Sequence, residues 1–376
     1  MTIGTLDPGK LEEVTDRAIG YLSGAGISAL VYLGDQLGLY RALRHGGPVT
    51  STKLATKSKL HERWVREWLH GQASAGLIRY VGEGLFKLTD EQAAVLADEG
   101  HPAFVAGGFA LLFPLLQRWE RLYESFRTGR GVPYNELGVD HAMGESRFSS
   151  PWMRANLVPV ILPGLDGVTP KLAAGAKVAD VGCGSGRALL EMARAYPNSE
   201  FQGYESSELA IRLADEHLAR FGLANVTFYR SAADTLRHDA SFDLVLTWDC
   251  LHDMTDPAGA MRAIRAAIKP DGTWLIVDIN GAPAPEENYG HPLGGLLYAF
   301  SVLDCLACST SEEEGAGLGT LGLPEPVARK MTAEAGFTRF TVRDFGNPLN
   351  SFYEVRPYGA ARQRHAANGG AILGRL

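Results

Sequence analysis

The sequence predicts an α/β protein whose C-terminal half is an open, mainly parallel sheet and whose N-terminal half is mainly helical. From about residue 170, short β-rich runs alternate with helical periods, a pattern that favours a parallel sheet with helices on both faces. The last two β-rich runs, 339–344 and 351–356, have only six residues between them. Six residues cannot hold a crossover helix, so these two strands should pair antiparallel.

The elements of the C-terminal half follow from hydrophobic runs and from residues that start or stop helices. Strands are predicted at 177–181, 200–204, 226–230, 242–247 and 272–278, and helices at 187–195, 207–221 and 256–268. Gly222 ends the second helix and Pro257 opens the third, as these two residues commonly do.

The N-terminal half contains a helix–turn–helix pattern followed by a small wing. A short helix around Leu54 and a turn at 58–60 precede a longer helix, in which the apolar face repeats at helical spacing (Val65, Trp68, Leu69, Gln72). The runs 77–81 and 85–88 then flank Gly82-Glu83-Gly84. The chain is therefore divided into a winged-helix-like domain (1–100), a helical linker, dimerisation and lid region (101–165), a ligand-binding α/β domain (166–358) and a disordered tail (359–376).

Composition and charge exclude several classes of protein. The 376 residues carry a net charge of −7 and only four cysteines, which excludes a disulfide scaffold and fits a reducing compartment. No signal peptide is recognisable, and the longest apolar run, 103–116, is shorter than a spanning helix and contains Pro114. These features predict a cytoplasmic protein without a membrane segment.

Charge also weighs against DNA binding by the winged helix. Residues 41–66 hold seven Lys or Arg and one acid, but residues 1–100 hold 11 bases and 12 acids. Glu62 and Glu67 lie on the helix that would read DNA, where they would face phosphates. The favoured roles of this domain are therefore dimerisation and formation of a lid over a substrate site in the C-terminal half.

A glycine-rich loop follows the first strand of the predicted sheet, in Asp180-Val-Gly182-Cys183-Gly184-Ser-Gly186. Glycines there let the backbone approach a ligand closely. Arg187 stands where the dinucleotide fingerprint needs its third glycine, and the Gly-Lys-Ser/Thr of a P-loop is missing. Asp180 before the turn suits a ligand with an ammonium group rather than a pyrophosphate.

Two further carboxylates follow the next strands. Glu205, beside Ser206, can accept hydrogen bonds from both hydroxyls of a ribose. After the third strand, Ala233 offers a small apolar wall and Asp234 an acceptor for an adenine amino group. Asp180, Glu205 and Asp234 therefore suit an amino-acid–ribose–adenine ligand.

These motifs resemble class I S-adenosylmethionine-dependent methyltransferases. The similar segments are DVGCGSG, FDLVLTWDCLHDM and IKPDGTWLIVD, and the resemblance extends to a subgroup with an N-terminal winged-helix domain, whose members are labelled methyltransferases or transcriptional regulators. It implies a seven-stranded Rossmann-like sheet with the last strand antiparallel, S-adenosylmethionine as cofactor and S-adenosylhomocysteine as product, and a homodimer. Where many members have Glu after the fifth strand, this chain has Asp278.

The candidate catalytic residues lie just after the fourth strand. Trp248 and Asp249 end that strand and should line the cofactor pocket, and His252 follows in Leu251-His252-Asp253. A histidine can act as general base toward a hydroxyl, and the resemblance adds that small-molecule O-methyltransferases carry their base in a similar His-Asp context. Asp253 is the candidate that orients His252.

Substrate-side candidates lie in the insertion before the last hairpin. They are Tyr289, His291, Tyr298 and Ser301. Cys305 and Cys308 form CxxC without a second ligand pair at zinc spacing, so a helix lining the acceptor pocket is favoured and no metal site is predicted. The predicted function is methylation of a small molecule, with oxygen as the favoured nucleophile. The alternative is a winged-helix transcriptional regulator that senses S-adenosylmethionine or a metabolite.

Overall fold

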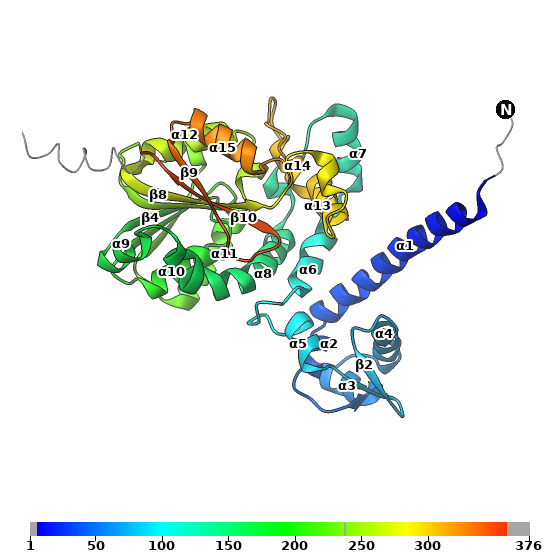
Figure 1. Ribbon diagram of the computed structural model, residues 1–376. Helices are drawn as coiled ribbons and strands as arrows, with labels where there is room; N and C mark the ends of the chain where they lie inside the picture. The colour runs from blue at the N-terminus through cyan, green and yellow to red at the C-terminus, as the bar shows by residue number, and fades with distance from the viewer. Residues whose placement is uncertain (1–5, 237, 359–376) are drawn as a thin grey trace, which may run out of the picture. The chain divides into compact units, whose positions relative to one another are not determined.

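The computed structural model describes residues 6–236 and 238–358 (Figure 1), without the side chain of Asp234. The predicted tail at 359–376 lies outside the described residues. Contacts divide the chain into two compact units. Unit 1 comprises Met1–Phe113 with Arg147–Trp152, and unit 2 comprises Pro114–Ser146 with Met153–Leu376. The region predicted as one linker, 101–165, therefore contributes to both units.

Unit 2 is built on a seven-stranded sheet in the order β6-β5-β4-β7-β8-β10-β9. The strands are β4 Lys177–Val181, β5 Glu200–Glu205, β6 Val226–Arg230, β7 Phe242–Trp248, β8 Ile268–Ile279, β9 Arg339–Arg343 and β10 Asn350–Arg356. Strands β4 to β8 pair in parallel, whereas β10 runs antiparallel to both β8 and β9. The predicted sheet and its antiparallel hairpin are confirmed.

Helices cover both faces of this sheet (Figure 1). On one side lie α10 Arg187–Ala195 and α11 Glu208–Phe221, and on the other α12 Pro257–Ala267 and α15 Glu325–Glu334. The sheet core includes Trp274, Ile276 and Tyr353, each at most 1% exposed. Shorter elements of the unit are η3 Leu162–Gly164, α9 Val168–Ala174, η4 Ala233–Thr235 and η5 Leu251–Asp253. Because the parallel strands all end at the same edge, the loops that follow them meet there.

Further helical segments of unit 2 precede the sheet in the sequence or lie between β8 and β9. They are α7 Trp119–Thr128, η1 Tyr134–Glu136, η2 Leu157–Ile161, η6 Pro285–Asn288, α13 Gly294–Phe300, η7 Ser301–Cys305 and α14 Leu306–Ser309, together with the two ends of α8 Val139–Asn156, whose residues Arg147–Trp152 belong to unit 1. The loop after α7 is tied to α14, because Gly131 N donates to Thr310 O and Val132 N to Ala307 O, each at 2.9 Å. A Cβ on Gly131 would lie 1.9 Å from Ala307 O, so only glycine fits there.

Unit 1 contains the winged helix. Its elements are α1 Pro8–Gln36, α2 Leu39–Leu43, β1 Val49–Thr50, α3 Ser51–Ser58, α4 Glu62–Ser74, β2 Arg79–Gly82, β3 Leu85–Lys87, α5 Asp90–Leu96 and α6 Ala106–Leu115, whose last two residues belong to unit 2. The predicted inward face of α4 is buried as expected, in Val65, Trp68, Leu69 and Gln72. Trp64, on the same helix, is by contrast 78% exposed.

The length and composition of the helices bear on whether one of them could cross a membrane. Within the described residues, no single helix is both long and apolar enough to cross a bilayer, although one pair bent by 106°, Val139–Gly164 and Val168–Ala174, meets the length and composition criteria together. The apolar run that the sequence singled out forms α6, with Pro114 inside it.

Candidate active site

The glycine loop after β4 depends on backbone conformations that favour glycine. Gly182, Gly184 and Gly186 have φ angles of 72°, 51° and 74°, values that side chains with a Cβ rarely adopt. A Cβ on Gly182 would lie 2.7 Å from Cys250 Sγ, and one on Gly186 would lie 2.3 Å from the ring of Phe228. Two of the three positions are therefore restricted by packing as well as by conformation.

Glu205 at the end of β5 holds this loop in place. Its carboxylate accepts hydrogen bonds from Gly184 N at 3.0 Å and from Ser207 N at 2.8 Å. Ser206 Oγ lies 3.5 Å away from the same carboxylate. Burial raises the pKa of Glu205, and the backbone N–H groups oppose that rise. The carboxylate predicted to bind ribose is thus fixed beside the glycine loop.

Asp180 is a buried carboxyl group without a full set of partners. It is 2% exposed, and its Oδ1 has no hydrogen-bond partner among the described residues. Burial, together with the Glu205 carboxylate, raises its pKa to about 8. A buried carboxylate is stable only when paired. The orphaned oxygen therefore fits the ammonium group of a ligand such as S-adenosylmethionine.

The other predicted cofactor residues lie around the same edge. Trp248 is half-buried and meets Phe352 edge-on, with ring centroids 6.2 Å apart. Asp249 has a left-handed φ of 48° and accepts a hydrogen bond from Asn350 Nδ2 at 2.7 Å. Burial raises the pKa of Asp249 to about 7, with a further contribution from Asp278. The remaining ones are Cys183, which is buried, Ala233, which packs on the sheet core, and Asp234, whose side chain is not described.

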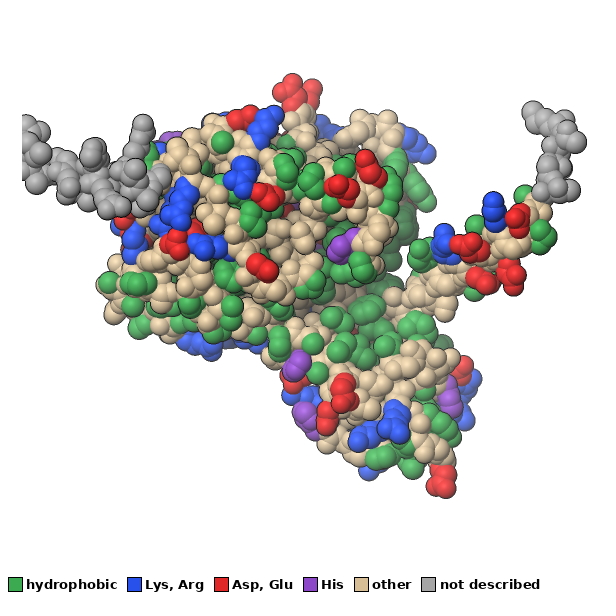
Figure 2. Space-filling model, viewed as in Figure 1, with side chains coloured by type: hydrophobic (Ala, Val, Ile, Leu, Met, Phe, Trp, Pro, Cys, Tyr) green, Lys and Arg blue, Asp and Glu red, His purple; other side chains and the backbone are tan. Residues whose placement is uncertain are grey.

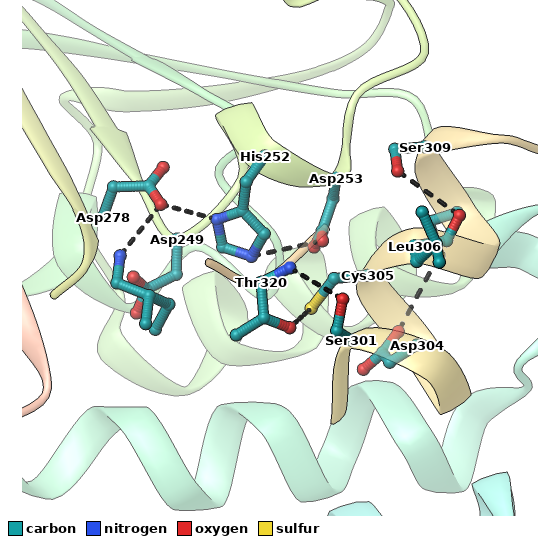
Figure 3. A network of polar contacts seen from close by, with 12 residues as sticks. Asp249, His252, Asp253, Asp278, Ser301, Asp304, Cys305, Leu306, Ser309 and Thr320 are labelled. Carbon is teal, nitrogen blue, oxygen red and sulfur yellow. Dashed lines mark hydrogen bonds and ion pairs between the residues drawn. The ribbon is translucent and has the colours of Figure 1, made fainter. Parts of the chain in front are cut away.

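His252 lies in η5, between two carboxylates (Figure 3). Its Nδ1 is 2.7 Å from Asp278 Oδ1, and its Nε2 is 3.3 Å from Asp253 Oδ1. Asp278 is fully buried at the end of β8, and its Oδ1 also accepts from Ile279 N at 2.8 Å. Burial by itself would lower the pKa of His252, but Asp278 and Asp253 raise it well above its usual range. The imidazole is therefore oriented through Nδ1, and both carboxylates stabilise its protonated form.

Asp278 was not predicted to act at the site, yet it is the carboxylate that holds Nδ1 of the histidine. The sequence marked it only as a departure from a family Glu. Asp253, the predicted partner, faces the other ring nitrogen instead. Burial raises the pKa of Asp253, and the neighbouring His252 opposes that rise.

A second group of polar side chains packs next to this histidine. His141 Nε2, on α8, lies 2.8 Å from Asp304 Oδ2, on η7. Tyr134 donates to Glu145 at 2.5 Å. Burial raises the pKa of Glu145, and the nearby charge of His252 lowers it. No motif pointed to these residues, although Asp304 was visible as a single acid inside the apolar stretch Tyr298–Ser309.

The four predicted substrate-side residues are spread over the insertion before β9. Tyr289 is 76% exposed. His291 Nδ1 accepts from Leu293 N, and the Tyr298 hydroxyl donates to Pro285 O. Ser301 alone joins the polar network of Figure 3, where it accepts from Thr320 N, while Thr320 Oγ1 donates to Cys305 Sγ at 2.8 Å. Cys305 and Cys308 are both buried and free.

Two family models match the chain. Residues 172–303 match the model described as a methyltransferase domain, and residues 25–98 match the one described as an Rv2258c-like winged HTH domain. The first range covers strands β4 to β8 with the glycine loop, and the second covers most of the winged helix. Both expectations drawn from the motifs are confirmed.

Curated relatives point to the same family. The ubiquinone biosynthesis O-methyltransferase of Cupriavidus pinatubonensis is 34% identical over 203 residues, which are 53% of this chain and 75% of that one. The Ralstonia nicotianae enzyme of the same name is 41% identical over 101 residues, 26% of this chain and 41% of that one. The mitomycin biosynthesis 6-O-methyltransferase of Streptomyces lavendulae is 25% identical and matches 68% of this chain and 75% of its own.

Solved structures share the whole fold. The mitomycin 7-O-methyltransferase structure has a TM-score of 0.69 at 20% identity and covers 93% of this chain and 99% of its own. The structure of human N-acetylserotonin methyltransferase, solved with S-adenosylmethionine, has a TM-score of 0.69 at 16% identity. The match covers 95% of this chain and 100% of that one. The chain therefore belongs to the S-adenosylmethionine-dependent methyltransferases. Within that class it combines the class I sheet with an N-terminal winged helix.

Proposed function

We propose that this chain methylates a hydroxyl oxygen of a small molecule, with His252 as the general base. The observation that carries the proposal is the 2.7 Å contact of His252 Nδ1 with the buried Asp278, in a loop that leaves the cofactor edge of the sheet. The names of the relatives, which are O-methyltransferases of ubiquinone and mitomycin biosynthesis, support oxygen as the nucleophile.

The cofactor is assigned to the loop after β4 and the strand ends beside it. When bound, S-adenosylmethionine supplies an electrophilic methyl group on a sulfonium. We assign its ammonium group to Asp180, whose buried oxygen lacks a partner, and its ribose hydroxyls to Glu205. Cys183, Gly182, Gly184, Gly186, Ser206, Ala233, Asp234, Trp248 and Asp249 complete the proposed set.

The protein's own part in the reaction is to orient the acceptor and remove a proton. Asp278 fixes Nδ1 as the protonated ring nitrogen, which leaves Nε2 to take the proton of the acceptor hydroxyl. The hydroxyl oxygen forms the new bond to carbon as the carbon–sulfur bond breaks. The proton ends on Nε2, next to Asp253, which stabilises the imidazolium. Exclusion of water by the buried surroundings of His252, which is 2% exposed, favours the oriented encounter.

Two assays test this proposal. Calorimetry should show binding of S-adenosylmethionine, and transfer of labelled methyl to a library of phenols, enols and amines should favour oxygen acceptors. Transfer to amines alone, or cofactor binding without transfer to any hydroxyl, would contradict O-methylation. Salt-sensitive, sequence-selective binding to genomic DNA would instead favour the regulator. On α4, however, Arg63 pairs with Glu67 and Arg66 with Glu62, which reduces its positive charge.

We further propose a homodimer formed through unit 1. Along α1, large apolar side chains stay in solvent between charged ones (Figure 2): Leu11, Val14, Ile19, Tyr21 and Leu22 are 52–75% exposed. A helix that carries so much exposed apolar surface is typical of an interface. Sedimentation should report a dimer, and a Leu22→Glu variant should shift it toward monomer. A wild-type monomer at micromolar concentration would contradict the proposal.

We also place the chain in the cytoplasm. All four cysteines are free, with buried or half-buried side chains, as expected where thiols stay reduced. Fractionation of cells that express the chain tests this location, and recovery of the protein from a membrane or secreted fraction would contradict it.

A further inference from the structure

His141 is a buried histidine with one ring nitrogen still unpaired. It is 1% exposed, its Nε2 lies 2.8 Å from Asp304 Oδ2, and its Nδ1 has no hydrogen-bond partner among the described residues. Its ring meets Tyr134 edge-on at 5.4 Å between centroids, so the side chain is held from two sides. A buried polar atom that lacks a partner is costly, which indicates that something outside the described residues pairs with this nitrogen.

The His141–Asp304 pair belongs to the same polar cluster as the proposed base. Asp304 is next in sequence to Cys305, and Cys305 Sγ, His252 and Asp253 present ligand-type atoms within 4.8 Å of one another. Asp304 raises the pKa of Asp253, and Asp253 in turn raises that of His141. Two histidine–aspartate pairs, from four separate segments of unit 2, are therefore neighbours in one buried cluster.

The charges of the side chains around His141 and His252 restrict which ligands can bind beside them. Burial lowers the pKa of His141, and the opposing influences are the carboxylates of Asp304, Glu145 and Asp253. Carboxyl groups outnumber the two histidines here, because Asp304 contacts His141, Asp278 and Asp253 flank His252, and Glu145 accepts from Tyr134 beside them. A carboxylate or phosphate on a ligand would meet like charge at low dielectric. A neutral ligand would not.

We propose that His141 Nδ1 binds a second oxygen function of the methyl acceptor, so that the acceptor carries at least two hydroxyl or carbonyl oxygens and no anionic group. A neutral His141 donates from Nε2 to Asp304 and accepts at Nδ1 from a hydroxyl. A protonated His141 donates from Nδ1 to a hydroxyl or carbonyl oxygen. A hydroxyl satisfies both forms. This inference rests on the proposed function, because it concerns the molecule whose other oxygen faces His252.

Two substitutions separate the two ring nitrogens of His141. The amide nitrogen of Gln reaches the position of Nε2, so His141→Gln can keep Asp304 paired while the Nδ1 position is lost. Asn occupies the Nδ1 position, so His141→Asn can keep contact with the acceptor. Ser309→Ala, in the neighbouring α14, serves as a control, because the Ser309 hydroxyl donates only to Leu306 O in its own helix.

The experiment is calorimetric binding of simple acceptors to the protein saturated with S-adenosylhomocysteine. The probes are phenol, the three dihydroxybenzenes and 3,4-dihydroxybenzoate, with naphthol and dihydroxynaphthalenes as larger equivalents. The wild type and Ser309→Ala should bind the best dihydroxy compound about tenfold more tightly than its monohydroxy partner, and should reject the benzoate. His141→Gln should bring that ratio close to one, while His141→Asn keeps most of it. A ratio within one variant does not depend on the fraction of protein that is folded.

Several results would overturn the assignment: no preference in the wild type, binding of no probe, an unchanged ratio in His141→Gln, or equal weakening of all probes. Tight binding of the benzoate would also contradict it. Labelled-methyl transfer to the same probes separates this inference from the proposed function. Transfer without any preference for a second oxygen overturns the role of His141 alone, whereas cofactor binding with no transfer to any hydroxyl overturns O-methylation itself.

Discussion

Two parts of unit 2 are rich in carboxylates but are built in opposite ways. One is the edge that we assign to the cofactor, with Asp180 and Glu205 (the cofactor edge). The other is the buried group around His252 and His141 that we assign to the acceptor (the acceptor-side cluster). At the cofactor edge, Glu205 accepts hydrogen bonds from the backbone N–H groups of Gly184, in the glycine loop, and of Ser207, two residues further along the chain. In the acceptor-side cluster, Asp278 and Asp304 are paired with histidines on other segments. The first arrangement is a local backbone motif, and the second exists only when distant segments have packed together.

Substitutions in the two regions should therefore have different effects on cofactor binding and on the chemical step. Changes at the cofactor edge should weaken cofactor affinity and leave the chemical step nearly intact. Changes in the acceptor-side cluster should slow the chemical step and leave cofactor affinity nearly intact. The predictions below test this separation.

The largest effect is expected for Asp278→Asn. Because Asp278 orients His252 through Nδ1, its loss should lower kcat by about a hundredfold or more, with a cofactor Kd within about twofold of the wild type. Steady-state kinetics and calorimetry measure the two quantities. Asp344→Asn, at the turn after β9, is the control and should change neither. A tenfold loss of cofactor affinity in Asp278→Asn would break the proposed separation.

Glu205→Gln should show the converse pattern. Loss of the charged acceptor for the ribose hydroxyls is expected to weaken S-adenosylmethionine about tenfold or more, with kcat at saturating cofactor changed by less than about threefold. Glu208→Gln removes an acid from the start of α11 that pairs only with Arg230 at the surface, and it should leave affinity unchanged. A fall in kcat without a change in Kd would place Glu205 in the chemical step instead.

The glycine loop offers a test by stability. Gly186 and Gly222 both have left-handed φ angles, 74° and 66°, but only the Cβ of an alanine at 186 would collide, at 2.3 Å from Phe228. Gly222→Ala should lower the free energy of unfolding by about 1–2 kcal/mol, and Gly186→Ala by clearly more. Urea denaturation of the two variants measures the difference. Equal losses would show that packing does not restrict the loop.

The smallest effect concerns pH. His252 must be neutral to accept a proton, and its pKa is raised by Asp278 and Asp253, so kcat/KM should rise with pH toward a plateau above the ordinary histidine range. Asp253→Asn removes one carboxylate that stabilises the imidazolium. Its rising limb should therefore move to lower pH. An unchanged limb in a stopped-time assay across pH 5 to 10 would contradict the contact with Asp253.

The sequence predicted the fold and the cofactor edge far better than the acceptor-side cluster. Strands β4 and β6 and helix α10 have the predicted bounds, and Gly222 and Pro257 mark the end of α11 and the start of α12 as predicted. The cofactor residues follow one another at strand ends, where spacing carries information. His141 and Asp304 are 163 residues apart, and their segments meet only in the folded chain, where Gly131 and Val132 bond to the region of α14. No local pattern encodes such a pair.

The role of Asp278 was also only partly predictable from the sequence. Its position after β8 was clear, but the register that sets it opposite His252 depends on β7 and β8 pairing in parallel. The sequence marked Asp278 only as a position where many members of the family have Glu. A carboxylate shorter by one methylene group still reaches the imidazole here, because η5 follows β7 directly after Asp249 and Cys250.

The most direct test of the account is His252→Ala, assayed for both methyl transfer and cofactor binding. The proposed base predicts that transfer of labelled methyl to the best hydroxyl acceptor falls by about a hundredfold or more, while calorimetry gives a Kd for S-adenosylmethionine within about twofold of the wild type. Transfer at near-normal rate by the folded variant would contradict the assignment of His252 as the general base.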